Sequence, residues 1–225
     1  MVSTAFSLDA AVKSISEDGF VDLEDLSAGE LVSEMEQKVF ALLSLYGLDY
    51  CKNNILGNTR IKSILESLLS RCSLGHLLRY TAFPGHIEAF RKGGPEAGLR
   101  VLVVQQWAKG SQVVYYGGSH KHDLPTVNGI RQLHETQKTA LDGMGCEAIE
   151  RNFPNGGLVV RDARLYAETK TGYALTYIFA TDEVVVAWPK IKVPNSQEYR
   201  QKAIDMESPT IGVNFVFSGL TGNLE

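Results

Sequence analysis

The stretch VLVVQQWAKGSQVVYYGGSHK, residues 101–121, decides the fold class of this chain. Two runs rich in β-branched and aromatic residues, 99–107 and 112–116, flank the turn pair Lys109-Gly110. The pair Gly117-Gly118 then ends the second run. This pattern predicts two short strands that are joined and bounded by tight turns.

Further runs of the same kind follow toward the C-terminus. They cover 157–166, 173–181 and 211–218, and Asn155-Gly156-Gly157 supplies turn residues before the first of them. The polar segment 195–207 interrupts the series and is predicted to form a helix or arm.

The N-terminal side reads as mostly helical. Asp9 can cap a short first helix, and the capping box Ser27-Ala-Gly-Glu30 predicts a longer second helix that ends at Gly47. A third helix is expected after Asn58-Thr59, with an apolar stripe that extends to Cys72 and a stop at Gly75. Helices followed by many strands predict one domain over 1–225, in which 1–80 is mostly a helical cover and 81–225 a β-sandwich or jelly-roll core.

Composition narrows the classes of function. The chain has 225 residues, 44% of them hydrophobic, which is enough for a full core. Its net charge of −4, without a Lys/Arg run, argues against nucleic acid as a partner. The N-terminal residues lack an apolar signal segment, so we expect a cytoplasmic protein with no membrane partner. Cys51, Cys72 and Cys146 form no C-x-x-C pair and are interpreted as buried thiols.

Three segments carry a resemblance to a known family. They are Ile15-Ser-Glu-Asp-Gly-Phe-Val-Asp-Leu-Glu-Asp-Leu26, the 101–107 strand with its Gly118-Ser-His-Lys121 turn, and Gly156-Gly-Leu-Val-Val-Arg-Asp-Ala-Arg164. In this order they resemble the phytanoyl-CoA dioxygenase-like branch of the Fe(II)/2-oxoglutarate-dependent oxygenases. The resemblance implies a cupin-like double-stranded β-helix. It spans most of the chain, from Ile15 to about Thr181.

That family holds a ferrous ion with two histidines and a carboxylate. His86-Ile87-Glu88 matches the first ligand pair, because residues two apart on a strand share a face. The resemblance places Ala167 at the second histidine, and alanine cannot bind iron. Tyr166 is adjacent but should point to the opposite side unless the strand bulges. An equally weighted alternative makes His86 and Glu88 solvated residues of a surface turn.

The family also uses an arginine to hold 2-oxoglutarate, a task suited to a guanidinium fork. The corresponding strand here, 173–181, contains no cation. We therefore expect no cofactor when the chain is alone. If the chain is active with unusual ligands, Fe(II) and 2-oxoglutarate are its cofactors, with Lys170 or Lys190 as the anchor.

Other polar and aromatic residues have competing interpretations. Asp162 and Arg164 share a strand face and are expected to form a structural ion pair. His120 and His122 have a spacing that permits metal binding, although a structural role is favoured, and His76 and His134 read as surface residues. The candidates for lining a pocket for a hydrophobic small molecule are Tyr115, Asp162, Arg164, Tyr166 and Tyr177.

Three functions remain open. The favoured one is a degenerate oxygenase that acts as a non-catalytic subunit, pairing in a hetero- or homodimer with an active relative of the same fold. By resemblance, such proteins belong to fungal pathways to natural products such as meroterpenoids. The second is an active non-haem iron 2-oxoglutarate-dependent dioxygenase with unusual ligands. The third is a metal-free isomerase or cyclase that uses the same cavity.

Overall fold

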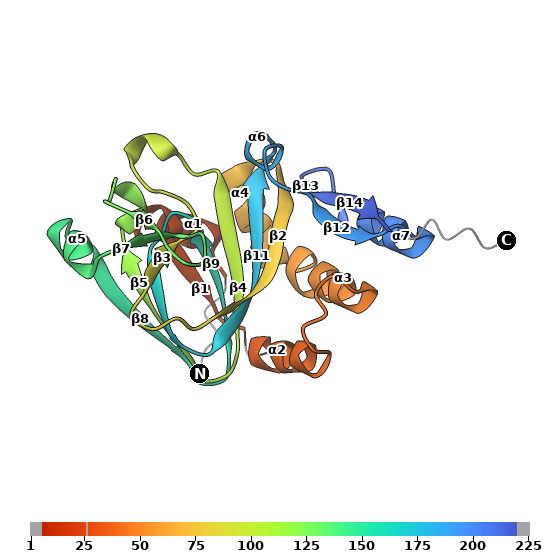
Figure 1. The fold of residues 1–225 in the computed structure, drawn as a ribbon, viewed down its shortest axis with the longest axis horizontal. Helices are drawn as coiled ribbons and strands as arrows, with labels where there is room; N and C mark the ends of the chain where they lie inside the picture. Colours follow the sequence, from red (N-terminus) through yellow and green to blue (C-terminus); the bar gives the residue numbers. More distant parts are fainter. Residues whose placement is uncertain (1–5, 26, 220–225) are drawn as a thin grey trace.

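Two six-stranded sheets face one another in the computed structural model, which describes residues 6–25 and 27–219 (Figure 1). The first sheet has the order β1-β9-β4-β11-β2-β13, and the second has the order β6-β7-β3-β10-β5-β8. The strands of the first sheet are β1 (Phe20–Leu23), β9 (Gly157–Asp162), β4 (Val101–Trp107), β11 (Tyr173–Thr181), β2 (Cys72–Thr81) and β13 (Ile211–Val213). Those of the second are β6 (Val127–Asn128), β7 (His134–Thr136), β3 (Ile87–Ala89), β10 (Ala167–Thr171), β5 (Ser111–Gly117) and β8 (Glu147–Phe153).

Strand β4 shows why the central run of the sequence is apolar on both faces. All seven of its residues are buried. Leu102 and Val104 belong to the core beneath the helices, whereas Trp107 packs in the space between the sheets. A strand covered on both sides needs no polar face, so the usual alternation of polar and apolar residues is lost. The space between the sheets is called the barrel interior below.

Helices cover the outer face of the first sheet. α2 (Ala28–Gln37) and α4 (Thr59–Leu69) contact strands of this sheet, and α3 (Leu45–Cys51) continues into the π-helix η1 (Lys52–Leu56). The remaining helices are α1 (Leu8–Glu17), α5 (Lys138–Gly143), α6 (Asp182–Val185), α7 (Gln197–Met206) and the 3-10 turns η2 (Pro95–Ala97) and η3 (Ser119–Lys121). A parallel pair, β12 (Ile191–Pro194) and β14 (Phe215–Ser218), lies beside α7 at one end of the molecule (Figure 1).

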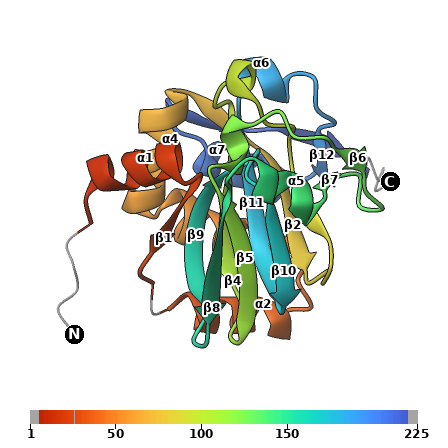
Figure 2. The ribbon, with the colours of Figure 1, turned by 90° about the vertical axis from the view of Figure 1, so that its left-hand side faces the viewer.

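The predicted jelly-roll architecture with a helical cover is confirmed, and several strand predictions hold closely. The run 173–181 is β11, and 112–116 lies in β5. The run predicted over 99–107 forms β4 from Val101 onward, and the run predicted over 157–166 forms β9 only as far as Asp162. β4 and β11 are neighbours in the first sheet, whereas β5 lies in the second sheet between β10 and β8 (Figure 2). The polar segment 195–207 contains α7. The run 211–218 divides into β13 and β14, which join different sheets.

The helix predictions need correction. Ser7, not Asp9, caps α1, because its hydroxyl accepts from the Ala10 N–H. Ser27 makes no helix-capping hydrogen bond, and the predicted helix ends at Gln37, ten residues before Gly47. The helix ends there because Val39 and Phe40, just beyond it, adopt positive φ angles, which an α-helix does not allow. Asn58 does cap α4 through the N–H groups of Arg60 and Ile61.

Residues 72–81 form β2 instead of continuing the helical cover. Cys72 and Gly75 therefore lie in a strand, as does His76. The strand pairs along its whole length with β11, so tertiary pairing overrides the helical spacing of the apolar residues. His134, predicted to be a surface residue, lies half-buried in β7.

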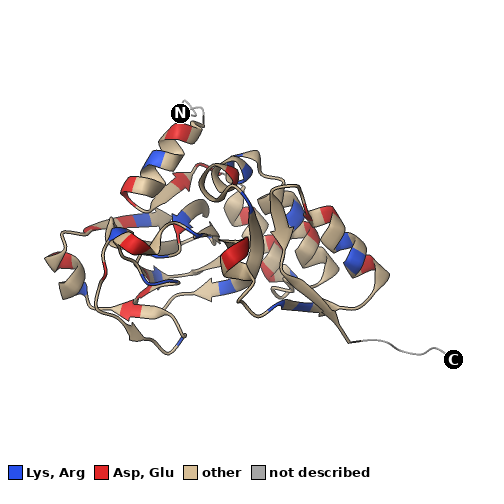
Figure 3. Cartoon of the chain, turned by 90° about the horizontal axis from the view of Figure 1, so that it is seen from above, with Lys and Arg blue, Asp and Glu red and all other residues tan. Residues whose placement is uncertain are grey.

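Charged residues of both signs are interspersed over the helices and loops (Figure 3). Within residues 6–25 and 27–219, no helix has the length and hydrophobicity needed to cross a membrane.

Candidate functional site

A row of four residues crosses the second sheet and defines the site. Glu135, Glu88, Ala167 and Tyr115 lie opposite one another in register on β7, β3, β10 and β5. Residues directly opposite in an antiparallel ladder share a sheet face. Tyr115 packs with Trp107 and Val159 of the first sheet, so this face points into the barrel interior. The ladder thus brings Ala167, the predicted third ligand position, directly beside Glu88.

Glu88 is a buried carboxylate that is already engaged by protein groups. Only 1% of its surface is exposed. The Tyr80 hydroxyl donates to its Oε2 at 2.7 Å, and Arg131 Nη1 lies 3.6 Å from the same oxygen. Burial, together with the neighbouring Glu88 carboxylate, raises the pKa of Tyr80, so its phenol stays protonated and donates. The second oxygen, Oε1, has no partner among the described residues.

His86 lies just before β3 and is held by a different set of contacts. Its Nδ1 lies 2.7 Å from Glu135 Oε1. Its ring stacks on Phe83, with 3.6 Å between the ring centroids and 3° between the planes. The imidazole is about one-third exposed, so the interpretation as a freely solvated turn residue does not describe it.

The segment 127–136, which we call the β6–β7 hairpin, supplies a polar partner to each of these two side chains. Arg131 faces Glu88, and Glu135 faces His86. Arg131 is fixed further by donating to the carbonyl oxygens of Thr81 and Ala82. Its guanidinium also lies 4.4 Å from the centre of the Phe83 ring. The hairpin therefore fixes both side chains that the family pattern assigns to iron.

The residues at this position do not fit a three-ligand iron centre. The side chain of Ala167 offers no donor atom, and Glu88 Oε2 is held by Tyr80 and Arg131. Among the described residues, no group of three or more His, Cys, Asp or Glu side chains converges in a way that could hold a metal. Tyr166 does not take the place of Ala167, because it packs with Ile87 and Ala89 on the opposite face of the second sheet.

Arg161 is a guanidinium inside the barrel that sequence reasoning missed. Strand β11 carries no cation, as the sequence shows, but β9 places Arg161 in the interior with 1% of its surface exposed. Its Nη1 donates to the Leu165 carbonyl at 3.0 Å, and the guanidinium lies 5.0 Å from the Phe90 ring centre. Burial lowers its pKa, while Tyr115, Tyr80, Asp162 and Glu88 oppose this shift.

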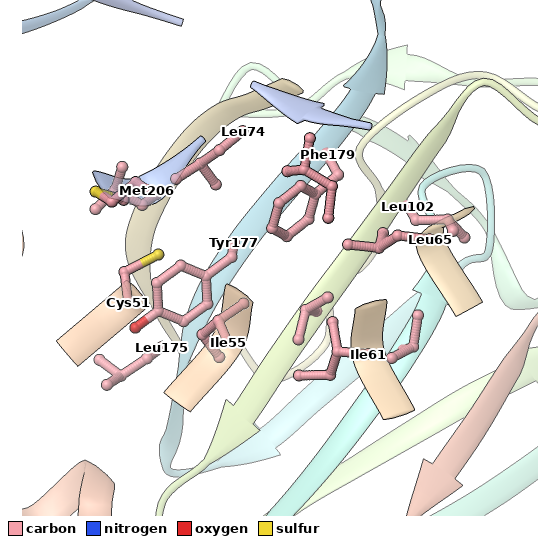
Figure 4. Close-up of a cluster of buried hydrophobic side chains, with 14 of the residues drawn as sticks. Cys51, Ile55, Ile61, Leu65, Leu74, Leu102, Leu175, Tyr177, Phe179 and Met206 are labelled. Carbon is pink, nitrogen blue, oxygen red and sulfur yellow. The ribbon is translucent and has the colours of Figure 1, made fainter. Parts of the chain in front are cut away.

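The remaining predicted pocket residues are dispersed. Tyr115 faces the interior, where its hydroxyl accepts from Trp107 Nε1 at 3.1 Å. Tyr177 lies on the other face of the first sheet, beside Cys51 beneath the helices (Figure 4). Asp162 and Arg164 form the expected ion pair, with 2.6 Å between Oδ2 and Nη2.

The candidate anchors and the other histidines lie away from the row. Lys170 is exposed and pairs with Glu168 at 2.7 Å, and Lys190 is also exposed. His120 is buried beneath the end of α1, with its Nε2 3.2 Å from the Ser16 carbonyl oxygen. His122 is half-buried in the loop that follows η3. The three cysteines are free, buried thiols, and burial raises the pKa of each.

Four residues of the site were not found from the sequence: Tyr80, Arg131, Glu135 and Arg161. Only Arg161 carried a local signal in the sequence. It directly follows the apolar run Leu158-Val-Val160, and because residues two apart on a strand share a face, Arg161 lies on the same face as Val159. The other three reach Glu88 and His86 only through the tertiary fold: Glu135 and Arg131 through the hairpin that pairs with β3, and Tyr80 from β2 in the facing sheet.

No known protein family and no curated protein matches this sequence. Solved structures do match. AviO1 from Streptomyces viridochromogenes Tue57 has a TM-score of 0.51 and 11% identity, covering 83% of this chain and 99% of that one. The epimerase SnoN, in complex with Fe3+, alpha ketoglutarate and nogalamycin RO, has a TM-score of 0.54 and 14% identity, covering 77% and 83%. The non-haem alpha-ketoglutarate-dependent carbocyclase SnoK from nogalamycin biosynthesis has a TM-score of 0.52 and 12% identity, covering 79% of this chain and 85% of that one.

At these identities the likeness concerns the fold. The facing sheets, the helical cover and the matches together give one conclusion: the chain has the cupin-like double-stranded β-helix of the iron- and 2-oxoglutarate-dependent oxygenases.

Proposed function

We propose that this chain is a degenerate relative of those oxygenases that works without iron of its own. In this proposal it is the non-catalytic subunit of a pair with an active oxygenase of the same fold, in a fungal pathway to a natural product. The observation that carries the proposal is the register of β3 and β10, which sets Ala167 opposite Glu88. Where an iron enzyme needs a third donor atom, this chain has a methyl group.

The surroundings of the row support the same proposal. A bound cation would have to compete with Arg131 and with the Tyr80 hydroxyl for Glu88, and His86 is held by Glu135. Arg131 supplies positive charge beside a buried carboxylate, and a buried carboxylate left unpaired would be costly. The β6–β7 hairpin therefore stabilises the interior in a role that a metal has in an active enzyme.

The pairing with an active subunit explains why the scaffold is kept while the ligand set is incomplete. The similar solved structures include SnoK from nogalamycin biosynthesis and SnoN in complex with nogalamycin RO, which supports a role in natural-product chemistry. A chain with this fold and no metal can still shape the pocket or stabilise the fold of a partner. The hydrophobic small molecule of such a pathway would then be converted by the partner.

The test uses the purified chain alone and after co-expression with an active oxygenase of the same fold from the same organism. Alone, with Fe(II), 2-oxoglutarate and oxygen, it should form no succinate above the level without protein. Co-expressed, it should co-purify with the active subunit and raise its turnover. Iron-dependent succinate formation by the chain alone would overturn the proposal in favour of an active dioxygenase. Conversion of a pathway intermediate by the chain in EDTA would overturn it in favour of a metal-free isomerase or cyclase.

A further inference from the structure

The longest open edge of the two six-stranded sheets is β8. Their edge strands are β1, β13, β6 and β8, which have four, three, two and seven residues. An open edge presents unpaired N–H and C=O groups to which another strand can add, and proteins usually keep such edges short. Among the described strands β8 pairs with β5 alone, and it runs along the outside of the molecule (Figure 1). It is therefore the edge best suited to the addition of a strand.

The backbone groups of β8 alternate between β5 and the open side. Tyr116 on β5 donates its N–H toward β10, to the Tyr166 carbonyl, so the residues before and after it direct their groups toward β8. The residue before it lies opposite Ile149, which therefore directs its own groups back to β5. Ala148 and Glu150, on either side of Ile149, direct theirs outward. Both are exposed, so this stretch of the edge is open to a partner.

The side chains of β8 are complementary to a second copy of the same strand. A two-fold axis perpendicular to the sheet pairs two copies antiparallel and keeps each side chain on its own face. With Ile149 on the axis, Glu147 lies opposite Arg151 of the other copy, and Ala148 lies opposite Glu150. Opposite charges directly across an antiparallel pair stabilise it, and like charges destabilise it. An axis at Glu150 or at Arg151 would instead place two like charges opposite one another. Ile149 is therefore the position that forms two ion pairs.

Two further features lie where this partner would be. The Arg151 side chain is 38% exposed, and Asp22 holds its Nε at 2.6 Å. Its Nη1 donates to the Glu150 carbonyl, which is an outward group, so the guanidinium reaches the open edge. Met144, just before β8, is 48% exposed. In the same arrangement it would lie near Pro154 of the other copy, which is also exposed. An apolar side chain would thus be covered at each end of the paired strands.

We propose that β8 is the contact surface of a homodimer, in which a second copy of this chain adds its own β8 antiparallel around a two-fold axis at Ile149. The second sheets of both copies then form one continuous sheet. Backbone hydrogen bonds between Ala148 and Glu150 hold the two strands, and ion pairs between Glu147 and Arg151 fix their register. The inference goes beyond the proposed function, because the partner there is an active oxygenase and the partner here is the same chain.

Sedimentation velocity of the full chain, from micromolar to near-millimolar concentration, tests the association. We expect a reversible equilibrium between monomer and dimer. Glu147→Arg sets like charges opposite one another twice per dimer and should weaken association about tenfold or more. The matched control is Glu150→Arg, the same change at the residue that faces Ala148 of the other copy, and it should leave the dissociation constant unchanged. Ala148→Pro removes an outward N–H that β5 does not use, so it should abolish the dimer.

A monomer at every concentration would overturn the inference, as would equal weakening by Glu147→Arg and Glu150→Arg. A dimer that persists in Ala148→Pro would also overturn it. Urea unfolding checks that each variant is folded, and the comparison of the two glutamate variants decides alone if Ala148→Pro is not. Each of these results would leave the iron-free function standing, because that is decided by iron binding and succinate formation.

Discussion

Ala167 and Glu88 face one another across β10 and β3, and the nearest charges to them come from the β6–β7 hairpin. The sequence predicted His86, Glu88 and Ala167 as one group, and the strand register sets two of them, Glu88 and Ala167, opposite one another. The sequence could not predict that Arg131 would lie beside Glu88 and Glu135 beside His86, because 43 and 49 positions separate these partners and only the pairing of β3 with β7 brings them together.

A histidine in place of Ala167 would restore the missing donor atom. Ala167→His, combined with Arg131→Gln to release Glu88, should bind Fe(II) near one equivalent, because three donors would then share a face. Iron is measured by plasma mass spectrometry after anaerobic loading and desalting. The matched control combines Thr169→His with the same Arg131→Gln change. Thr169 lies two residues after Ala167 on β10 and is also buried. Equal iron in both variants would mean that the row is not the metal position of the fold.

The second residue-scale prediction concerns pH. Burial lowers the pKa of His120, although Asp162 opposes the shift. As the pH falls through about 6.5, His120 binds a proton in the unfolded chain before it does so in the folded chain. The free energy of unfolding should therefore decrease as the pH drops below about 6.5. His120→Gln should make this decrease shallower in urea titrations at pH 7.5 and 5.5. An unchanged slope would show that His120 is not responsible.

At the scale of elements, strands that pair over their whole length were predicted well when their sequence was continuous and apolar. β4 and β11 are of this kind, because both faces are covered. The start of β2 was assigned to the third helix, since Cys72 continues the apolar stripe of that helix and only pairing with β11 shows that residues 72–81 form a strand. The break after α2 was missed for a related reason. Val39 and Phe40 are residue types that rarely adopt positive φ angles, so the sequence does not predict this conformation.

The start of α2 packs against the turn between β8 and β9, residues 154–156. A Cβ at Gly156 would lie 2.3 Å from the Gly29 Cα, and Gly156 has a φ of +84°. Gly156→Ala should therefore cost about 3 kcal/mol or more, from strain and overpacking together. Gly145 has a φ of +70° but open space, so Gly145→Ala should cost only about 1 kcal/mol. Urea unfolding of both variants measures the difference, and equal costs would show that α2 does not pack against this turn.

At the scale of the whole molecule, the fold followed from the order of helices and strands, and the solved relatives share it. What the sequence could not convey is how the barrel interior is filled. Arg161, Tyr80 and Arg131 come from three separate segments, and each reaches Glu88 or its surroundings only after both sheets have formed. An interior with two guanidinium groups and a protonated phenol around one carboxylate differs in its chemistry from an open iron site.

The binding of Fe(II) by the native chain tests this account most directly. Anaerobic equilibrium dialysis against micromolar Fe(II), with and without 2-oxoglutarate, measures the bound metal per chain. We predict far less than one equivalent in both conditions, because Ala167 leaves Glu88 and His86 without a third donor. One equivalent of iron that is lost in His86→Ala would contradict the central claim.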